Sequence, residues 1–177
     1  MISLIRLWNS LESWVKLMFD RGKPEAAQLL DLLREKNLHI STAESCTGGM
    51  IATSLTAIAG SSDVVNGGIV SYTNQVKHEV LGVKQETLDA FSAVSEECTR
   101  EMAEGVAKLL KTEVSVSVSG YAGPSGGTAE KPTGTVCFGF YVHGKTSSAT
   151  KHFIGDRANV RREAVLFAVH ELIEKLC

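Results

Sequence analysis

The chain has 177 residues, a formal net charge of -2 at pH 7 and a pI near 6.2. Hydrophobic residues make up 44% and charged residues 21%, which is typical of a soluble globular protein, and the length suits one domain with a sizeable core. The charge balance supplies no broad face to neutralise phosphates, which argues against a dedicated nucleic-acid-binding protein. We therefore expect a small-molecule substrate.

The cysteine pattern indicates thiols that are neither paired nor metal-bound. Cys46, Cys98, Cys137 and Cys177 are scattered, with no C-x-x-C pair and no histidine cluster at zinc spacing. We expect no metal and no bound cofactor. In the absence of a secretory signal, the thiols read as those of a reduced, cytoplasmic protein.

Residues 1–22 are predicted to form an amphipathic helical extension, and residues 23–177 the main domain. An apolar stripe at helical spacing runs along the extension: Leu4, Leu7, Trp8, Leu11, Trp14, Val15 and Met18. Charged residues interrupt it, so no membrane span is predicted. We expect this helix to pack on the domain or on a partner subunit, with no membrane attachment, which makes a homo-oligomer such as a dimer the expected assembly.

The first half of the domain alternates helices and strands. Pro24 suits the first turn of a helix that ends at Asn37, residues 39–43 alternate as a strand does, and apolar positions recur at helical spacing from Met50. A turn, a strand, a short helix and a longer helix are then predicted over residues 59–62, 64–73, 75–81 and 96–111. The glycines in 66–68 predict a bulge or bend in that strand.

The second half predicts a mixed sheet. A strand over residues 114–118 leads into a glycine-rich loop, and two β runs over 134–142 and 146–154 follow at hairpin spacing. A final helix begins near Asp156. This order of elements predicts an α/β protein: a three-layer α/β/α sandwich around a mixed, mostly parallel sheet with a C-terminal β-hairpin.

Ser45 lies in the turn between the first strand and the helix that begins at Met50. Backbone N–H groups without intrahelical partners gather at such a turn, where they can hold an anion or a developing oxyanion. Gly48 and Gly49 would let a ligand approach the backbone closely. From the spacing alone, Ser45 is either a nucleophile or an N-cap.

Several separated motifs together carry a resemblance to a known family. They are Thr42-Ala43-Glu44-Ser45-Cys46-Thr47-Gly48-Gly49, Gly60-Ser61-Ser62, Val70-Ser71-Tyr72-Thr73-Asn74-Gln75-Val76-Lys77, Ala93-Val94-Ser95, Ser119 to Gly127, Lys131-Pro132-Thr133-Gly134 and Gly155-Asp156-Arg157. In this order they resemble the CinA C-terminal domain family, in its stand-alone form as a nicotinamide-nucleotide amidase, over roughly residues 25 to 177. The resemblance implies hydrolysis of the carboxamide of nicotinamide mononucleotide to nicotinic acid mononucleotide and ammonia.

The resemblance also implies catalytic roles: Ser45 as the nucleophile and Lys77 as the base, with Tyr72 nearby. A serine needs a base to attack an amide near neutral pH. Lysine must be neutral to accept the proton, which requires its pKa of about 10.4 to fall by about three units, or roughly 4 kcal/mol of differential destabilisation. We therefore expect a dry site around Lys77. Glu44 could orient Lys77 or be a surface carboxylate.

The remaining predicted site residues bind substrate. The oxyanion is expected at backbone N–H groups of Cys46, Thr47, Gly48 and Gly49, and the loop of Gly120, Tyr121, Ala122 and Gly123 is expected to line the pocket. Tyr121 either stacks on the nicotinamide ring or packs in the core. Arg157 either binds the substrate phosphate or pairs with Asp156.

Two alternatives stay open from the sequence. Cys46 could be the nucleophile, with His78 or His152 as its base. The chain could also be a non-catalytic nucleotide-binding or assembly domain that has kept the pocket and lost turnover.

Overall fold

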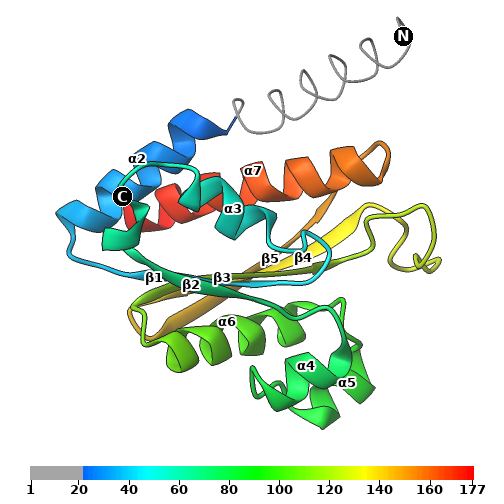
Figure 1. Ribbon diagram of the computed structural model, residues 1–177. Helices are drawn as coiled ribbons and strands as arrows, with labels where there is room; N and C mark the ends of the chain where they lie inside the picture. Colours follow the sequence, from blue (N-terminus) through cyan, green and yellow to red (C-terminus); the bar gives the residue numbers. More distant parts are fainter. Residues whose placement is uncertain (1–21) are drawn as a thin grey trace, which may run out of the picture.

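A five-stranded sheet forms the middle layer of the protein (Figure 1), in the spatial order β2-β1-β3-β4-β5. The computed structural model describes residues 22–177, so residues 1–21 of the predicted helical extension lie outside the described part. The strands are β1 (Ile40–Glu44), β2 (Val65–Val70), β3 (Val114–Gly120), β4 (Thr135–Val142) and β5 (Lys145–His152). β1 pairs in parallel with β2 and β3, and β4 pairs antiparallel with β3 and β5. Four of these five strands therefore point the same way, which confirms the predicted mixed sheet.

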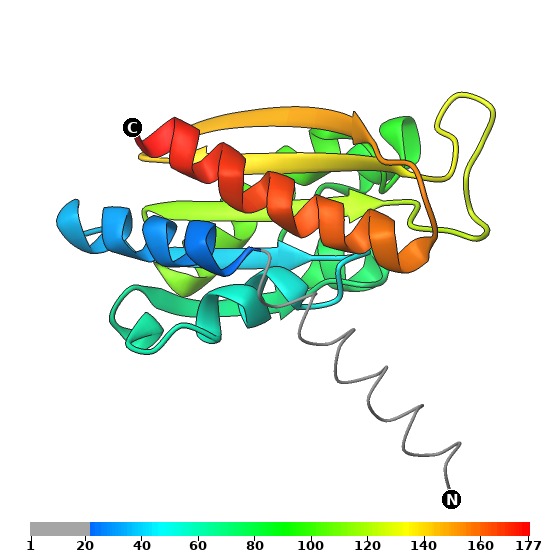
Figure 2. The ribbon, with the colours of Figure 1, turned by 90° about the horizontal axis from the view of Figure 1, so that it is seen from above.

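Helices cover both faces of the sheet, as Figures 1 and 2 show, with α2, α3 and α7 on one face and α4, α5 and α6 on the other. They are α2 (Lys23–Glu35), α3 (Met50–Thr56), α4 (Asn74–Glu79), α5 (Gln85–Phe91), α6 (Glu96–Leu110) and α7 (Arg157–Leu176), with a short 3₁₀ turn over Ser61–Asp63. The predicted three-layer α/β/α sandwich is confirmed. Only α5 was not predicted.

Local sequence signals explain most helix boundaries. Pro24 lies in the first turn of α2, and Asn37 follows its end with a φ of 52°, a left-handed conformation that asparagine tolerates better than most residues. Ser95 and Asp156 cap α6 and α7, because their side chains accept hydrogen bonds from the backbone N–H groups of Cys98 and Asn159.

The predicted bulge lies in β2, and the predicted hairpin connection is one residue shorter than expected, because Lys145 belongs to β5. The β1–β2 register jumps from the pair Ile40 and Val65 to the pair Ser41 and Gly67, which leaves Asn66 as the extra residue of a bulge. The β4–β5 hairpin turns through His143 and Gly144, both with positive φ, as a two-residue turn of the favoured hand requires.

The two faces of β3 explain how the layers pack. Val114, Val116 and Val118 are fully buried in the core beneath α2 and α7. Ser115 and Ser117 point to the other face, where their hydroxyls donate to the backbone carbonyls of Ala103 and Thr99 in α6 at 2.6 and 2.5 Å. Small side chains there let α6 lie close against the sheet.

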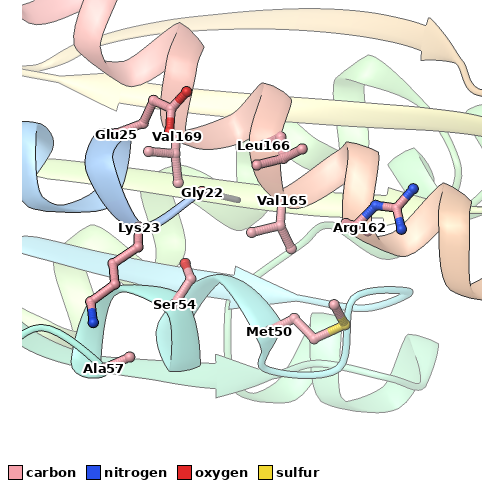
Figure 3. Close-up of a pocket in the computed structure, with 10 residues that line it drawn as sticks. All are labelled: Gly22, Lys23, Glu25, Met50, Ser54, Ala57, Arg162, Val165, Leu166 and Val169. Carbon is pink, nitrogen blue, oxygen red and sulfur yellow. The ribbon is translucent and has the colours of Figure 1, made fainter. Parts of the chain in front are cut away.

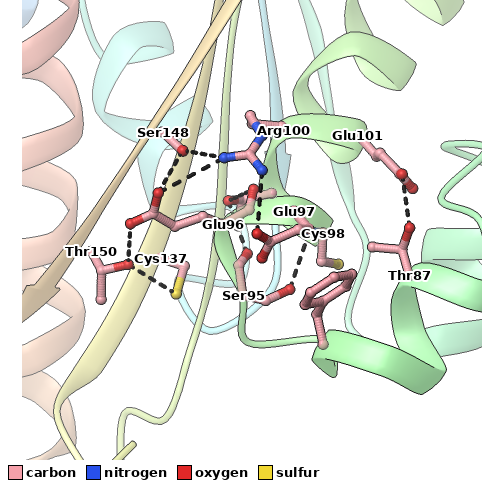
Figure 4. A network of polar contacts seen from close by, with 12 residues as sticks. Thr87, Ser95, Glu96, Glu97, Cys98, Arg100, Glu101, Cys137, Ser148 and Thr150 are labelled. Atoms are coloured by element: carbon pink, nitrogen blue, oxygen red, sulfur yellow. Dashed lines mark hydrogen bonds and ion pairs between the residues drawn. The ribbon is translucent and has the colours of Figure 1, made fainter.

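A polar network fixes the N-terminal end of α6 to β5 (Figure 4). The carboxylate of Glu96 accepts hydrogen bonds from Ser148 and Thr150 at 2.7 and 2.8 Å, and these bonds lower its pKa. Arg100 donates to Ser148 at 2.7 Å and lies 3.8 Å from Glu96. We interpret this network as structural, because every charged group in it has a partner.

Candidate active site

Two of the three predicted catalytic residues, Ser45 and Lys77, meet at the carboxyl ends of β1 and β2, the edge where open α/β sheets place their ligand sites. Ser45 directly follows β1, whereas Lys77 lies in α4, beyond β2. Because β1 pairs in parallel with β2, the segments that follow the two strands leave the sheet side by side. The fold therefore brings together groups that are 32 positions apart in the sequence.

Ser45 and Lys77 form a buried contact. Lys77 Nζ lies 3.2 Å from Ser45 Oγ and donates to the carbonyl oxygen of Ser71 at 2.7 Å. The Lys77 side chain enters from α4, whose N-terminus is capped by the Thr73 hydroxyl. Lys77 is 1% exposed, and burial lowers the pKa of its ammonium group.

This arrangement suits proton transfer between the two side chains. A neutral amine has one lone pair and two N–H bonds. Because the Ser71 carbonyl engages one N–H, the lone pair can face the Ser45 hydroxyl. Serine with an adjacent desolvated lysine has the parts of an activated nucleophile.

Glu44 holds the turn that carries Ser45. It is 1% exposed, and its carboxylate accepts hydrogen bonds from the backbone N–H groups of Gly49, Ile51 and Ala52 at 3.1, 3.0 and 2.8 Å, and from the Thr42 hydroxyl at 3.2 Å. Both expectations for Glu44, an orienting contact with Lys77 and an exposed carboxylate, are wrong. The Glu44 carboxylate instead binds the backbone N–H groups at the N-terminus of α3, where the sequence analysis expected an anion or oxyanion.

Of the four backbone N–H groups predicted to bind the oxyanion, only two are free to do so in this turn. The N–H of Gly48 donates to the Ser45 carbonyl at 3.1 Å, and that of Gly49 is taken by Glu44. Over residues 22–177, the N–H groups of Cys46 and Thr47 donate to no other residue. These two remain available for an oxyanion next to Ser45.

Gly48 and Gly49 serve the turn through their backbone conformation. Their φ values are 62° and 93°, in the left-handed region that costs side-chain-bearing residues energy. They allow the chain to reverse between Ser45 and α3 within four residues.

Arg161 of α7 also contacts this turn, and the sequence analysis missed it. Its guanidinium donates to the carbonyl oxygen of Thr47 at 2.8 Å. Its Nε and the hydroxyl of Thr47 are buried, and each lacks a hydrogen-bond partner in the described part of the chain. The available signal was helical spacing, because Arg157 and Arg161 lie one turn apart at the start of α7.

Arg157 bridges the loops that follow β2 and β3. Its guanidinium donates to the carbonyl oxygen of Gly123 at 3.0 Å and to the Tyr72 hydroxyl at 3.3 Å. Tyr72 is 60% exposed, so it lies at the rim of the site, whereas Lys77 lies inside. Asp156, the alternative partner for Arg157, instead caps α7 through Asn159.

The glycine-rich loop is held in place at its base. The N–H of Tyr121 donates to Thr135 at 2.9 Å, and the Tyr121 carbonyl accepts from Gly134 at 2.7 Å. Ala122 is buried in the core, and the Tyr121 side chain lines a hollow beside Ser95 and Lys131. The structure thus brings Gly123 to Arg157 while Tyr121 borders a hollow near the end of α5.

The alternative cysteine site is not assembled. Burial raises the pKa of the Cys46 thiol to about 12, which keeps it protonated near neutral pH. His78 Nδ1 lies 2.7 Å from the Val83 carbonyl and His152 Nδ1 lies 3.5 Å from the Thr135 hydroxyl, and within residues 22–177 no hydrogen bond joins either ring to Cys46.

Residues 22–177 contain neither a metal-binding cluster nor a helix that could span a membrane. Histidine, cysteine, aspartate and glutamate side chains form no group of three or more that could hold a metal ion. No helix in this range has the length and apolar character needed to cross a membrane.

Comparisons with known proteins agree on one family. The model of the CinA C-terminal domain matches residues 23–176. The nicotinamide-nucleotide amidohydrolase PncC of Enterobacter agglomerans is 48% identical over 144 residues, which cover 81% of this chain and 88% of that protein. A CinA-like protein of Kosmotoga olearia is 50% identical over 141 residues, which cover 80% of this chain and 34% of that protein, so the match spans about a third of that relative.

Solved structures show the same fold. The crystal structure of a CinA superfamily protein from Enterobacter cloacae superposes with a TM-score of 0.86 at 38% sequence identity, covering 88% of this chain and 92% of that one. A protein from Agrobacterium tumefaciens, described as competence/damage inducible, gives 0.82 at 40% identity, covering 86% and 93%.

Proposed function

Because the chain belongs to the CinA C-terminal domain family, we propose that it hydrolyses the carboxamide of nicotinamide mononucleotide, giving nicotinic acid mononucleotide and ammonia. The observation that carries this proposal is the buried contact of 3.2 Å between Lys77 Nζ and Ser45 Oγ. The similarity to a relative named nicotinamide-nucleotide amidohydrolase, over most of that relative's length, supports the substrate.

The proposed reaction begins with acylation of Ser45. Its Oγ attacks the carboxamide carbon while neutral Lys77 takes the hydroxyl proton, and the N–H groups of Cys46 and Thr47 stabilise the oxyanion. Collapse of the tetrahedral intermediate breaks the C–N bond, and Lys77 returns the proton to the leaving nitrogen, which departs as ammonia.

Deacylation follows the same path in reverse. Water attacks the acyl-enzyme ester, Lys77 accepts its proton, and the second tetrahedral intermediate expels Ser45 Oγ, which is reprotonated. The product is the carboxylic acid. One water is consumed and one ammonia released, and the protein ends unchanged.

Cationic groups near the turn suit the substrate's phosphate. Arg157 and Arg161 both lie close enough to lower the pKa of Cys46 electrostatically, although burial outweighs them. A guanidinium binds phosphate well because its planar fork matches two oxygens. We assign Arg157 to the phosphate, with Tyr72 beside it at the rim.

Ammonia release from nicotinamide mononucleotide tests the proposal. We expect turnover by the wild-type chain and a fall in kcat of about 10³-fold or more for Ser45→Ala, because the covalent route is lost. The exposed residue Ser62 provides the control, and Ser62→Ala should retain activity. Binding of the nucleotide without ammonia release by folded wild type would instead indicate a non-catalytic nucleotide-binding domain.

A further inference from the structure

A small apolar groove lies between α2, α3 and α7, away from Ser45 and Lys77 (Figure 3). Met50 of α3 and Ala57, which directly follows α3, line one side, and Val165 and Leu166 of α7 line the other. Gly22, the first described residue, lines it as well. The groove is therefore situated where the chain enters the described structure.

Two polar atoms beside this groove lack partners. Glu25 Oε2 and Arg162 Nε are buried, and neither has a hydrogen-bond partner within residues 22–177. Both residues line the groove, as Figure 3 shows. A buried polar atom without a partner destabilises the fold, because it has lost its hydrogen bonds to water. A covering segment that is mainly apolar and carries a hydrogen-bond donor for the Glu25 carboxylate would remove part of that destabilisation.

The sequence directly before Gly22 has this chemistry. Its apolar stripe ends in Leu11, Trp14, Val15 and Met18. Trp8 and Trp14 are the two tryptophans of the chain, and an indole N–H is a donor with no acceptor function. Met18 precedes Gly22 by four positions, a span of at most about 14 Å when fully extended. The lower end of the stripe is thus within reach of the groove.

We propose that residues 11–20 of the same chain cover this groove with the apolar stripe. The covalent connection favours the chain's own segment over that of a second copy, because a short linker gives an effective concentration in the millimolar range. Protein at micromolar concentration cannot compete with such a tether unless the linker prevents docking. The proposal does not depend on the amidase activity.

Tryptophan fluorescence of the full-length protein tests the proposal, because both tryptophans precede Gly22. We expect emission at shorter wavelength than that of free tryptophan and reduced quenching by acrylamide. Trp14→Phe should remove most of this signature, and Trp8→Phe should keep it. Emission equal to that of free tryptophan in the folded protein would overturn the proposal.

Groove variants show where the segment docks. Leu166→Asp places a carboxylate on the half-buried wall, and Ala57→Glu places one at the exposed rim with little risk to folding. Both should shift the emission to longer wavelength and restore quenching. The matched control is Leu109→Asp. Leu109 is an exposed residue of α6, on the opposite face of the sheet, and its substitution should leave the emission unchanged. Unchanged emission in both groove variants would place the tryptophans elsewhere.

Dilution separates the possible occupants. Docking within one chain predicts the same emission at all protein concentrations and no change in sedimentation for Ala57→Glu. Emission that shifts to longer wavelength on dilution, together with dissociation of a dimer, would show a second copy in the groove. A blue shift seen only with lipid vesicles would show a membrane-binding segment. Either result overturns the proposal.

Discussion

Lys77 Nζ lies 3.2 Å from Ser45 Oγ and donates to the carbonyl oxygen of Ser71 at 2.7 Å. The amine is thus held between Ser45, the proposed nucleophile, and the chain segment that follows β2. Its burial, with 1% exposure, makes the charged form unfavourable and lowers its pKa, which suits the proposed role of base.

Lys77→Met should separate activity from stability. Loss of the base should reduce kcat by about 10²-fold to 10⁴-fold. Removal of the buried amine relieves its desolvation cost but leaves the Ser71 carbonyl without its donor, so the free energy of unfolding should change by no more than about 1 kcal/mol. Ammonia release and thermal unfolding measure the two effects, with exposed Lys108→Met as the control. A larger loss of stability together with the loss of activity would contradict this interpretation.

The pH dependence follows from the lowered pKa of Lys77. Because the base acts when neutral, kcat/KM should rise with pH through the folded-state pKa, below the usual value of 10.5. Between these two pKa values the unfolded chain binds more protons, so stability should also rise with pH there. Unfolding midpoints across that window should flatten in Lys77→Met. An unchanged slope would show that Lys77 does not titrate as proposed.

Glu44→Gln should weaken the turn that carries Ser45. A carboxylate accepts from the N–H groups of Gly49, Ile51 and Ala52 at the start of α3, whereas an amide turns a donor toward some of them. We expect a loss of about 2–3 kcal/mol in the free energy of unfolding, as for bonds to charged groups. Urea unfolding measures it. Glu86→Gln, in the first turn of α5 and exposed, is the matched control and should change little.

The sequence was sufficient to predict most of the fold, and the structure shows why some features were missed. Pro24, Asn37 and Ser95 determine helix boundaries through their own backbone or capping preferences, so these boundaries could be predicted from the sequence. α5 has seven residues, too few for a helical period to stand out. The role of Glu44 was missed because its hydrogen-bond partners are mostly backbone N–H groups, which any residue type can supply. The pairing of Ser45 with Lys77 came from family resemblance, because contacts across 32 positions depend on strand order.

Arg157→Lys tests the phosphate assignment. Lysine keeps the charge and loses the planar fork that reaches both Gly123 and Tyr72. We expect KM for nicotinamide mononucleotide to rise about tenfold, or roughly 1.4 kcal/mol, with kcat changed less. The same measurement with nicotinamide riboside, which lacks the phosphate, is the control. An equal rise in KM for both substrates would contradict a phosphate contact.

Cys46→Ala should retain most of the activity. The thiol has a pKa raised to about 12 by burial, so iodoacetamide should modify exposed Cys177 and leave Cys46 unmodified in the native protein. Peptide mass spectrometry and ammonia release measure both outcomes. Inactivation that substrate prevents, with the label on Cys46, would restore the cysteine mechanism.

β2 is an edge strand of the sheet, and it carries two glycines and a bulge. Glycine weakens a strand because it has no side chain to pack. The segment that carries Lys77, the proposed base, therefore follows a strand at the edge of the sheet, whereas Ser45, the proposed nucleophile, follows an inner strand. Brief detachment of β2 from β1 would separate Lys77 from Ser45 while the inner strands stay folded. We therefore expect that the protein can lose activity reversibly, through local opening at β2, while the rest of the sheet stays folded.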